Sequence, residues 1–275
     1  MKNVLFFSLV LLFGFQTFAQ RKPKIKGNKN VVEVRESLPV FNGIQLDDDL
    51  EVVLKKGTSE AYTLKIDDNL IDVLKFKVEG NTLFISSFYN ITSKRKLEIT
   101  VYYNELNQIT MNNGEISMSD VISGERLDVL TKETSRLELN ATADVININM
   151  EGISSGDFNV ASDSLVMTLK DRIDVKVYST GDTNNLFMYE NASAKLEGAT
   201  DNFMAKLYGK STLKAEALEA KNTMLILEDS PEAHVNVLEE LQLSSRGSSR
   251  TSLYGNPKIT ILDFLDTSRL DKENN

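Results

Sequence analysis

The feature that most constrains this sequence is a short repeat, of roughly 20 residues per unit, which begins near Ile109. Each unit carries a polar residue followed by alternating apolar positions, as in Ser135-Arg136-Leu137-Glu138-Leu139. The apolar residues taken as equivalent are separated by steps that are alternately longer and shorter: Leu137, Phe158, Val175, Leu196, Leu213, Val235 and Leu253. Such a unit is too short to bury its own apolar face, so repeats of this length stack into a solenoid.

The alternation of apolar and polar residues has the period of two that is typical of half-buried strands. Two or three strands of about 5 residues, joined by tight corners, account for one coil of a parallel β-helix. We therefore predict an all-β chain, with residues 39–265 forming a single parallel β-helix domain (a β-solenoid) of roughly 20-residue coils and a less regular N-terminal portion. An antiparallel β-sandwich stays open, because strands at about 10-residue spacing fit that class too.

Residues 1–19 have the pattern of a signal peptide. Lys2 supplies a positive charge, residues 4–13 are almost entirely apolar, and Ala19 precedes the expected cleavage point. Gln20 stands where a lipoprotein would need cysteine, and the chain has no cysteine at all. We expect an exported protein of the periplasm or cell surface that is not an N-terminal lipoprotein. No later segment has the ~20 apolar residues of a transmembrane helix.

The two ends of the mature chain have few apolar residues that could be buried. Residues 20–38 begin with a basic, proline-containing stretch, which we interpret as a linker, and residues 266–275 are polar, which predicts a disordered tail. Between them, residues 39–108 are less repetitive than the rest. Since the open end of a solenoid needs a cap, we predict that this segment covers the N-terminal end of the stack. Within it, residues 78–83 have the composition of a hairpin turn.

Composition argues against most catalytic and nucleic-acid-binding classes. The net charge is −9, which repels phosphate backbones, so no nucleic acid is expected as a partner. His234 is the only histidine, so neither a multi-histidine metal site nor a recognisable Ser-His-Asp triad is available. We predict that His234 faces solvent, and we predict no catalytic residue, no metal site and no cofactor.

Three weaker groups of residues are weighed against their structural roles. Residues 47–49 and 67–68 are aspartates that offer oxygen ligands to calcium, but neither run has a known calcium-loop spacing, and solvated turns are the expected interpretation. Arg246 and Arg250, about one repeat after Glu228 and Asp229, would be the basic and acidic partners of a polysaccharide lyase on this fold. The aromatic residues at 88–89 and 102–103 suit either sugar stacking or packing in the sheet.

The chain also resembles a known family, the autotransporter-adhesin head, GIN-domain family of Bacteroidetes envelope proteins. The resemblance covers roughly residues 39–262 and rests on the order of these motifs: Phe41-Asn42-Gly43-Ile44, Leu50-Glu51-Val52-Val53-Leu54-Lys55-Lys56-Gly57, Asp67-Asp68-Asn69-Leu70-Ile71, Val78-Glu79-Gly80-Asn81-Thr82-Leu83-Phe84-Ile85, the repeats, and Ser252-Leu253-Tyr254-Gly255-Asn256-Pro257-Lys258-Ile259.

The resemblance implies a right-handed β-helix and no catalytic residues. The sequence departs from the family's Ser-Gly-Ser-Gly corners: only single glycines remain, at Gly114, Gly156 and Gly181, and the corner at 229–231 has none. We therefore expect less regular turns. Three functions are consistent with these observations: an adhesin-like binding protein with an unknown protein or glycan ligand, a polysaccharide-active enzyme, and a periplasmic structural or regulatory module with a protein partner. The ligand and the oligomeric state stay open.

Overall fold

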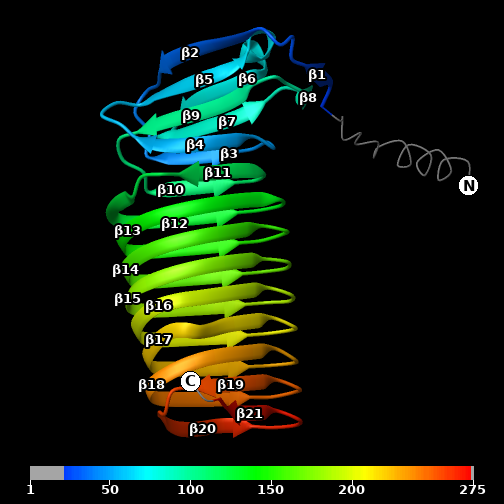
Figure 1. Cartoon of the computed structure of the whole chain (residues 1–275). Helices are drawn as coiled ribbons and strands as arrows, with labels where there is room; N and C mark the ends of the chain where they lie inside the picture. Colours follow the sequence, from blue (N-terminus) through cyan, green and yellow to red (C-terminus); the bar gives the residue numbers. More distant parts are fainter. Residues whose placement is uncertain (1–21, 274–275) are drawn as a thin grey trace, which may run out of the picture.

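The computed structural model describes residues 22–273, and they form a parallel β-solenoid of about nine turns with a cap at its N-terminal end (Figure 1). The predicted signal peptide lies outside this range. Seven strands form the regular coils: β12 (Ile122–Thr131), β13 (Ser135–Met150), β14 (Ser155–Leu169), β15 (Asp174–Met188), β16 (Ser193–Leu207), β17 (Thr212–Leu227) and β18 (Glu232–Ser245). Three shorter strands end the stack: β19 (Arg250–Tyr254), β20 (Lys258–Phe264) and β21 (Arg269–Lys272).

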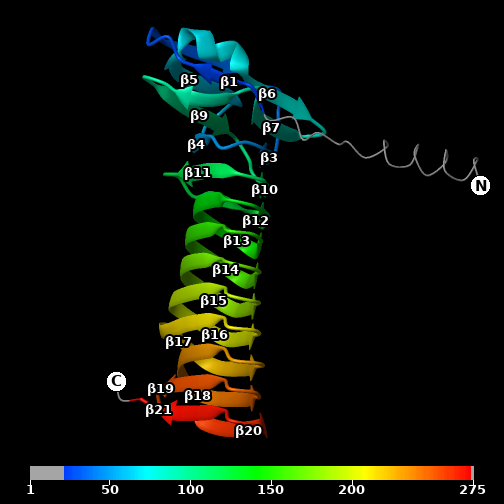
Figure 2. The ribbon, with the colours of Figure 1, turned by 90° about the vertical axis from the view of Figure 1, so that its right-hand side faces the viewer.

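The first two coils are built from shorter strands, and the cap lies beyond them. The coil strands are β3 (Gly43–Leu46), β4 (Glu51–Lys56), β10 (Gln108–Met111) and β11 (Gly114–Met118). The cap contains β1 (Lys24–Lys26), β2 (Val31–Ser37), β5 (Ala61–Asp67), the 3-10 helix η1 (Asp68–Val73), β6 (Leu74–Glu79), β7 (Thr82–Ser87), β8 (Asn90–Ser93) and β9 (Leu97–Tyr103). The view in Figure 2 shows the coils as one narrow column with the cap above it.

Interior side chains stack in columns that run along the solenoid. One column contains six buried apolar residues in register, one from each coil: Ile148, Met167, Leu186, Ala205, Leu225 and Leu243. Burial in this column is nearly complete because each side chain packs on its equivalent in the coil above and below. The alternating pattern therefore predicted the fold class correctly, and the parallel pairing of successive coils excludes the antiparallel sandwich.

The sequence alignment of the repeats shifts by two positions at each step from Leu137 to Val235, whereas Leu253 is in register with Val235. Phe158 pairs with Leu139 and Val177, not with Leu137 and Val175, so the step from coil to coil is the same on both sides of Phe158. Each strand segment of a coil, here called an arm, has two interior positions that are two residues apart. Inspection of the sequence selects the position with the bulkier side chain. Gly156 occupies the position opposite Leu137, and a Cβ there would lie 2.1 Å from the Phe158 ring, so the neighbouring aromatic ring fills that space.

The corners are more regular than their few glycines suggested. One residue in each coil has a left-handed backbone with φ between +49° and +82°: Glu133, Gly152, Asp171, Glu190, Gly209, Asp229, Gly247 and Asp266. Aspartate occupies this corner position in three of the coils that lack glycine there. The carboxylate of each of these aspartates accepts a hydrogen bond from the glycine N–H at the same corner one coil earlier. The three pairs are Gly152 N to Asp171 at 3.0 Å, Gly209 N to Asp229 at 3.2 Å and Gly247 N to Asp266 at 2.9 Å.

Gly247→Ala is expected to destabilise the fold by about 2–4 kcal/mol, from left-handed strain together with overpacking. Gly247 has φ +77°, and a Cβ there would lie 2.2 Å from the Asp229 carbonyl oxygen of the neighbouring coil. Gly80→Ala is the matched control, because Gly80 also has a positive φ (+54°) but nothing lies within 4 Å of its Cβ position. Urea unfolding of both variants measures the difference, and equal losses would contradict the close-contact argument.

The cap covers the N-terminal end with strands of both directions. Parallel strands β7 and β9 pair with β3 and β4 of the first coil, and antiparallel strands β6 and β5 then pair with β7 and β9. Residues 61–103 of the predicted segment 39–108 cover this end, whereas β3 and β4 of that segment form the first coil, and β1 and β2 from outside it also belong to the cap. The expected hairpin joins β6 to β7, with Glu79 opposite Thr82 and positive φ at Gly80 and Asn81, as a two-residue turn requires.

Both predicted terminal segments contain strands. Residues 20–38 are not only a linker, because β2 pairs with β5 along its whole length and β1 pairs with β8. Residues 266–275 are not only a tail, because β21 pairs with β19. Both β2 and β21 are edge strands that are largely exposed, so β21 is mostly polar and β2 alternates valine with charged residues.

Candidate functional site

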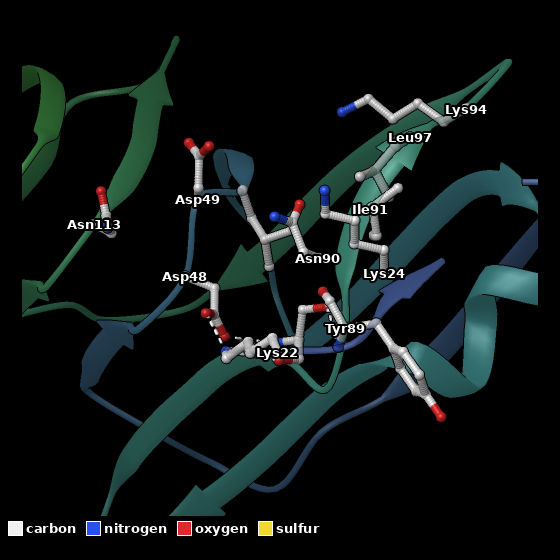
Figure 3. Close-up of a pocket in the computed structure, with 12 residues that line it drawn as sticks. Lys22, Lys24, Asp48, Asp49, Tyr89, Asn90, Ile91, Lys94, Leu97 and Asn113 are labelled. Atoms are coloured by element: carbon white, nitrogen blue, oxygen red, sulfur yellow. Dashed lines mark hydrogen bonds and ion pairs between the residues drawn. The ribbon is translucent and has the colours of Figure 1, made fainter. Parts of the chain in front are cut away.

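A partly open pocket of about 480 Å³ lies where the cap meets the first coil (Figure 3). We call it the junction pocket. Segments far apart in the sequence supply its lining residues: Lys22, Lys24, Asp48, Asp49, Leu50, Ser87, Tyr89, Asn90, Ile91, Lys94, Leu97 and Asn113. Its volume is within the range of small-molecule sites, which are commonly concave and lined by mixed apolar and polar groups.

One wall of the junction pocket is fixed by a network of hydrogen bonds. The Lys22 ammonium pairs with the Asp48 carboxylate and donates to the Ser87 carbonyl oxygen at 2.8 Å. Asp48 also accepts from the Ser87 N–H at 2.7 Å, and the Ser87 hydroxyl donates to the Tyr89 carbonyl oxygen at 2.7 Å. Lys22 and Asp48 thus neutralise each other, and the polar groups of this wall are already bonded to one another.

The remaining polar side chains of the junction pocket have no side-chain partner among residues 22–273. Lys24 and Lys94 are exposed and lie within 4 Å of no described carboxylate, and no hydrogen bond is made by the side chains of Asp49, Asn90 or Asn113. In Figure 3, Lys24 and Lys94 extend from one side toward the middle, while Asp49 and Asn113 lie on the other side. These groups can therefore contact a ligand without first breaking an internal bond.

Apolar side chains also contribute to the lining. Leu50 and Leu97 are buried, with 5% and 8% of their surface exposed, and Ile91 is partly buried beside them. The Tyr89 ring points away from Lys24 and Asn90 in Figure 3, so this aromatic ring does not face the middle of the pocket. The groups that can contact a ligand are therefore two free ammonium groups, one free carboxylate, two amides and a small apolar surface.

A contrasting surface follows one corner of the solenoid. The strand registers place five carboxylates in one row on successive coils: Glu125, Asp144, Asp163, Asp182 and Asp201. The row ends where Lys221 of the next coil pairs with Asp201 at 2.6 Å. Adjacent strands lie about 4.8 Å apart, so like charges repel along this row. The junction pocket, with its two lysines that have no carboxylate partner among the described residues, differs in charge from this acidic row.

The structure separates the aspartates singled out in the sequence. Asp67 is completely buried rather than in a solvated turn, and it accepts backbone N–H bonds from Lys29, Arg95 and Lys96 at 3.1–3.3 Å. Its neighbour Asp68 is partly exposed, and hydrogen bonds from the Asn30 and Asn28 side chains lower the pKa of its carboxyl group. Within residues 22–273, no group of three or more histidine, aspartate or glutamate side chains has an arrangement that could hold a metal ion.

Of the other sequence candidates, Arg246 and Glu228 lie on successive coils and their charges interact, but they are not joined by a pocket with the remaining candidates. His234 is partly exposed, with its Nε2 atom 3.2 Å from Glu232. Arg246 pairs with Asp263 at 2.8 Å, and Arg250 lies between Glu232 and Arg269 on neighbouring strands. Neither arginine lines the junction pocket.

The four aromatic residues have different roles. Phe88 is 70% exposed and Tyr89 is at the junction pocket, whereas Tyr102 lies under the Arg35 guanidinium at 4.7 Å. Tyr103 is buried in the core, and this burial, with a smaller effect of Asp120, raises its pKa to about 12. Phe88 and Tyr89 are therefore the exposed pair, although Phe88 does not line the junction pocket and the Tyr89 ring points away from its middle.

Sequence reasoning missed the lysines of the junction pocket. Lys24 lies in the segment interpreted as a linker, and Lys94 is far from it along the chain, directly after β8. The signal that could have revealed them is an alternating strand at 31–37, which shows that the N-terminal segment is folded against the cap.

Among the described residues, no helix is long and apolar enough to span a bilayer.

Solved structures similar to this one cover nearly the whole chain. A "putative adhesin" from Parabacteroides distasonis has a TM-score of 0.65 at 13% identity, covering 91% of this chain and 100% of its own. A "putative adhesin" from Parabacteroides merdae has a TM-score of 0.62 at 10% identity, with coverage of 91% and 99%. A "putative lipid binding protein" from Parabacteroides distasonis has a TM-score of 0.61 at 18% identity, with the same coverage. At these identities the likeness establishes the shared fold.

A family model provides the assignment. None of the curated proteins compared with the chain matches it. The model described as "Putative auto-transporter adhesin, head GIN domain" matches residues 40–257, which include the cap from β5 onward and all the regular coils. The resemblance noted in the sequence is thus confirmed, and the chain belongs to the auto-transporter adhesin head, GIN-domain family.

Proposed function

We propose that this chain is an exported, adhesin-like protein that binds a glycan at the cap end of its solenoid and carries out no catalytic step. The observation that supports this most directly is the junction pocket, where ligand-facing polar groups are unpaired within the described chain while the wall behind them is fixed. A solenoid suits such a role because its stacked coils form a rigid support for a site at one end.

The polar lining favours a glycan over a wholly apolar ligand. Sugar hydroxyls both donate and accept hydrogen bonds, so they can satisfy the Asn90 and Asn113 amides and the Asp49 carboxylate at once. The apolar patch of Leu50, Ile91 and Leu97 is small, and it suits the C–H face of a sugar ring better than an acyl chain.

Purified protein that begins at Gln20 is expected to be retained by a subset of glycans on an array of neutral and acidic oligosaccharides. Retention should survive Arg246→Ala and Arg250→Ala, since these residues lie away from the junction pocket. The array itself reports on turnover, because cleavage would release labelled glycan ends. Lack of retention on every glycan would contradict the proposed function, and release of label would favour the enzyme in its place.

Export to the outer surface predicts that protease added to intact cells digests this chain. The control is the same treatment after lysis, together with a cytoplasmic marker that must stay intact in the first sample. Protection until lysis would place the protein in the periplasm and favour a structural or regulatory module with a protein partner.

A further inference from the structure

The unpaired groups of the junction pocket differ in charge, and this restricts the ligand. Lys22 is neutralised by Asp48, which leaves the ammonium groups of Lys24 and Lys94 against the single carboxylate of Asp49. The free lining therefore has an excess of positive charge on a protein whose net charge is −9. An anionic group is favoured between the two lysines, because charge-assisted hydrogen bonds are stronger than neutral ones.

Asp49 argues against a small inorganic anion. Its exposed carboxylate only accepts hydrogen bonds, so a fully deprotonated anion beside it would be repelled. A ligand that fits both sides of the pocket needs an anionic group facing Lys24 and Lys94 and hydrogen-bond donors facing Asp49 and Asn113. Figure 3 shows these two pairs on opposite sides of the pocket.

We propose that the junction pocket binds a carboxylated sugar unit of a glycan, with the carboxylate held by Lys24 and Lys94 and the hydroxyls by Asp49, Asn90 and Asn113. This inference rests on the proposed glycan-binding function and specifies the ligand class and the residues. A pocket of about 480 Å³ is in the size range of ordinary ligand sites and leaves room for a sugar unit. The fixed Lys22–Asp48–Ser87 wall acts as support, because its groups already bond to one another.

The arrangement also explains why the site needs the cap to be folded. Lys24 lies in β1 and Asn90 in β8, and the register places these two residues directly opposite each other. Lys94 directly follows β8, whereas Asp49 and Asn113 come from turns of the first two coils. The two lysines and Asn90 therefore belong to, or directly follow, the small β1–β8 sheet, whereas Asp49 and Asn113 belong to the solenoid.

The test is a glycan array on which hexuronate and sialic-acid oligosaccharides each stand beside their carboxyl-reduced forms. The intact protein is expected to bind at least one carboxylated glycan about tenfold or more tightly than its reduced form, since two charge-assisted contacts are lost on reduction. The double variant Lys24→Ala/Lys94→Ala is expected to lose the same factor. The matched control is Lys176→Ala/Lys214→Ala, which removes two exposed lysines from a solenoid face and should bind like the unmodified protein.

The outcomes separate this inference from the proposed function. Binding of neutral glycans alone, or acidic binding that survives Lys24→Ala/Lys94→Ala, would overturn the carboxylate site and leave glycan binding intact. Absence of binding to every glycan would overturn both. Circular dichroism of the double variant checks its fold, and Lys24→Gln/Lys94→Gln, which keeps most of the side-chain length and its hydrogen-bonding capacity, should lose affinity too if charge is the cause.

Discussion

Removal of residues 22–106 is expected to leave the remaining chain insoluble or aggregated. The cap strands β7 and β9 provide the hydrogen-bonding partners of β3 and β4, and together they cover the first interior layer. The deletion also removes β3 and β4, which pair with β10 and β11. In the shortened chain β10 and β11 would therefore become open edge strands, and the buried side chains of Ile109, Met111 and Ile116 would face water. Unpaired strand edges with apolar side chains are templates for aggregation.

The opposite end of the solenoid supplies a control for this experiment. The last coil is already open, since Ile259, Ile261 and Phe264 of β20 are 43–45% exposed. Removal of residues 258–275 would therefore replace one open end by another, and that variant is expected to stay soluble with some loss of stability. Soluble fraction, size-exclusion chromatography and thermal unfolding compare the two truncations. A soluble, cooperatively unfolding 107–275 fragment would contradict the capping role.

Asp67→Ala is expected to destabilise the protein by about 3–5 kcal/mol, because three backbone N–H groups would lose their buried acceptor. The Asp67 carboxylate is completely buried and accepts from the backbone of Lys29, Arg95 and Lys96. These donors belong to the loop before β2 and the loop before β9, so one side chain joins two separate parts of the cap. A Cβ at Gly27 would lie 2.0 Å from the same carboxylate, so glycine is required there for close packing.

The neighbouring Asp68 provides a matched control for Asp67. Asp68 bonds to the side chains of Asn28 and Asn30, at the surface, so Asp68→Ala is expected to change stability little. Asp67→Asn separates acceptor loss from cavity formation, since the amide has nearly the same shape but must turn an NH₂ group toward backbone donors. Urea unfolding of the three variants should give a free energy of unfolding that is much lower for Asp67→Ala and Asp67→Asn than for Asp68→Ala. Similar values for Asp67→Ala and Asp68→Ala would contradict the structural role of the buried carboxylate.

The sequence by itself determined the fold class, the approximate repeat length and the family. An interior column such as Ile148, Met167 and Leu186 needs an apolar residue at the same place in every coil. The spacing of apolar residues in the sequence therefore shows the repeat period. The hairpin at 78–83 was equally local, because two adjacent residues with positive φ have a strong compositional preference.

Only the tertiary structure decided the register, the burial of Asp67 and the junction pocket. Two interior positions per arm give a sequence pattern that fits Leu137 or Leu139 equally well, and only the pairing with Phe158 selects Leu139. Asp67 looks like a turn former until distant backbone donors surround it. The lysines at 24 and 94 are brought together by the pairing of β1 with β8, which depends on long-range contacts that no local pattern encodes.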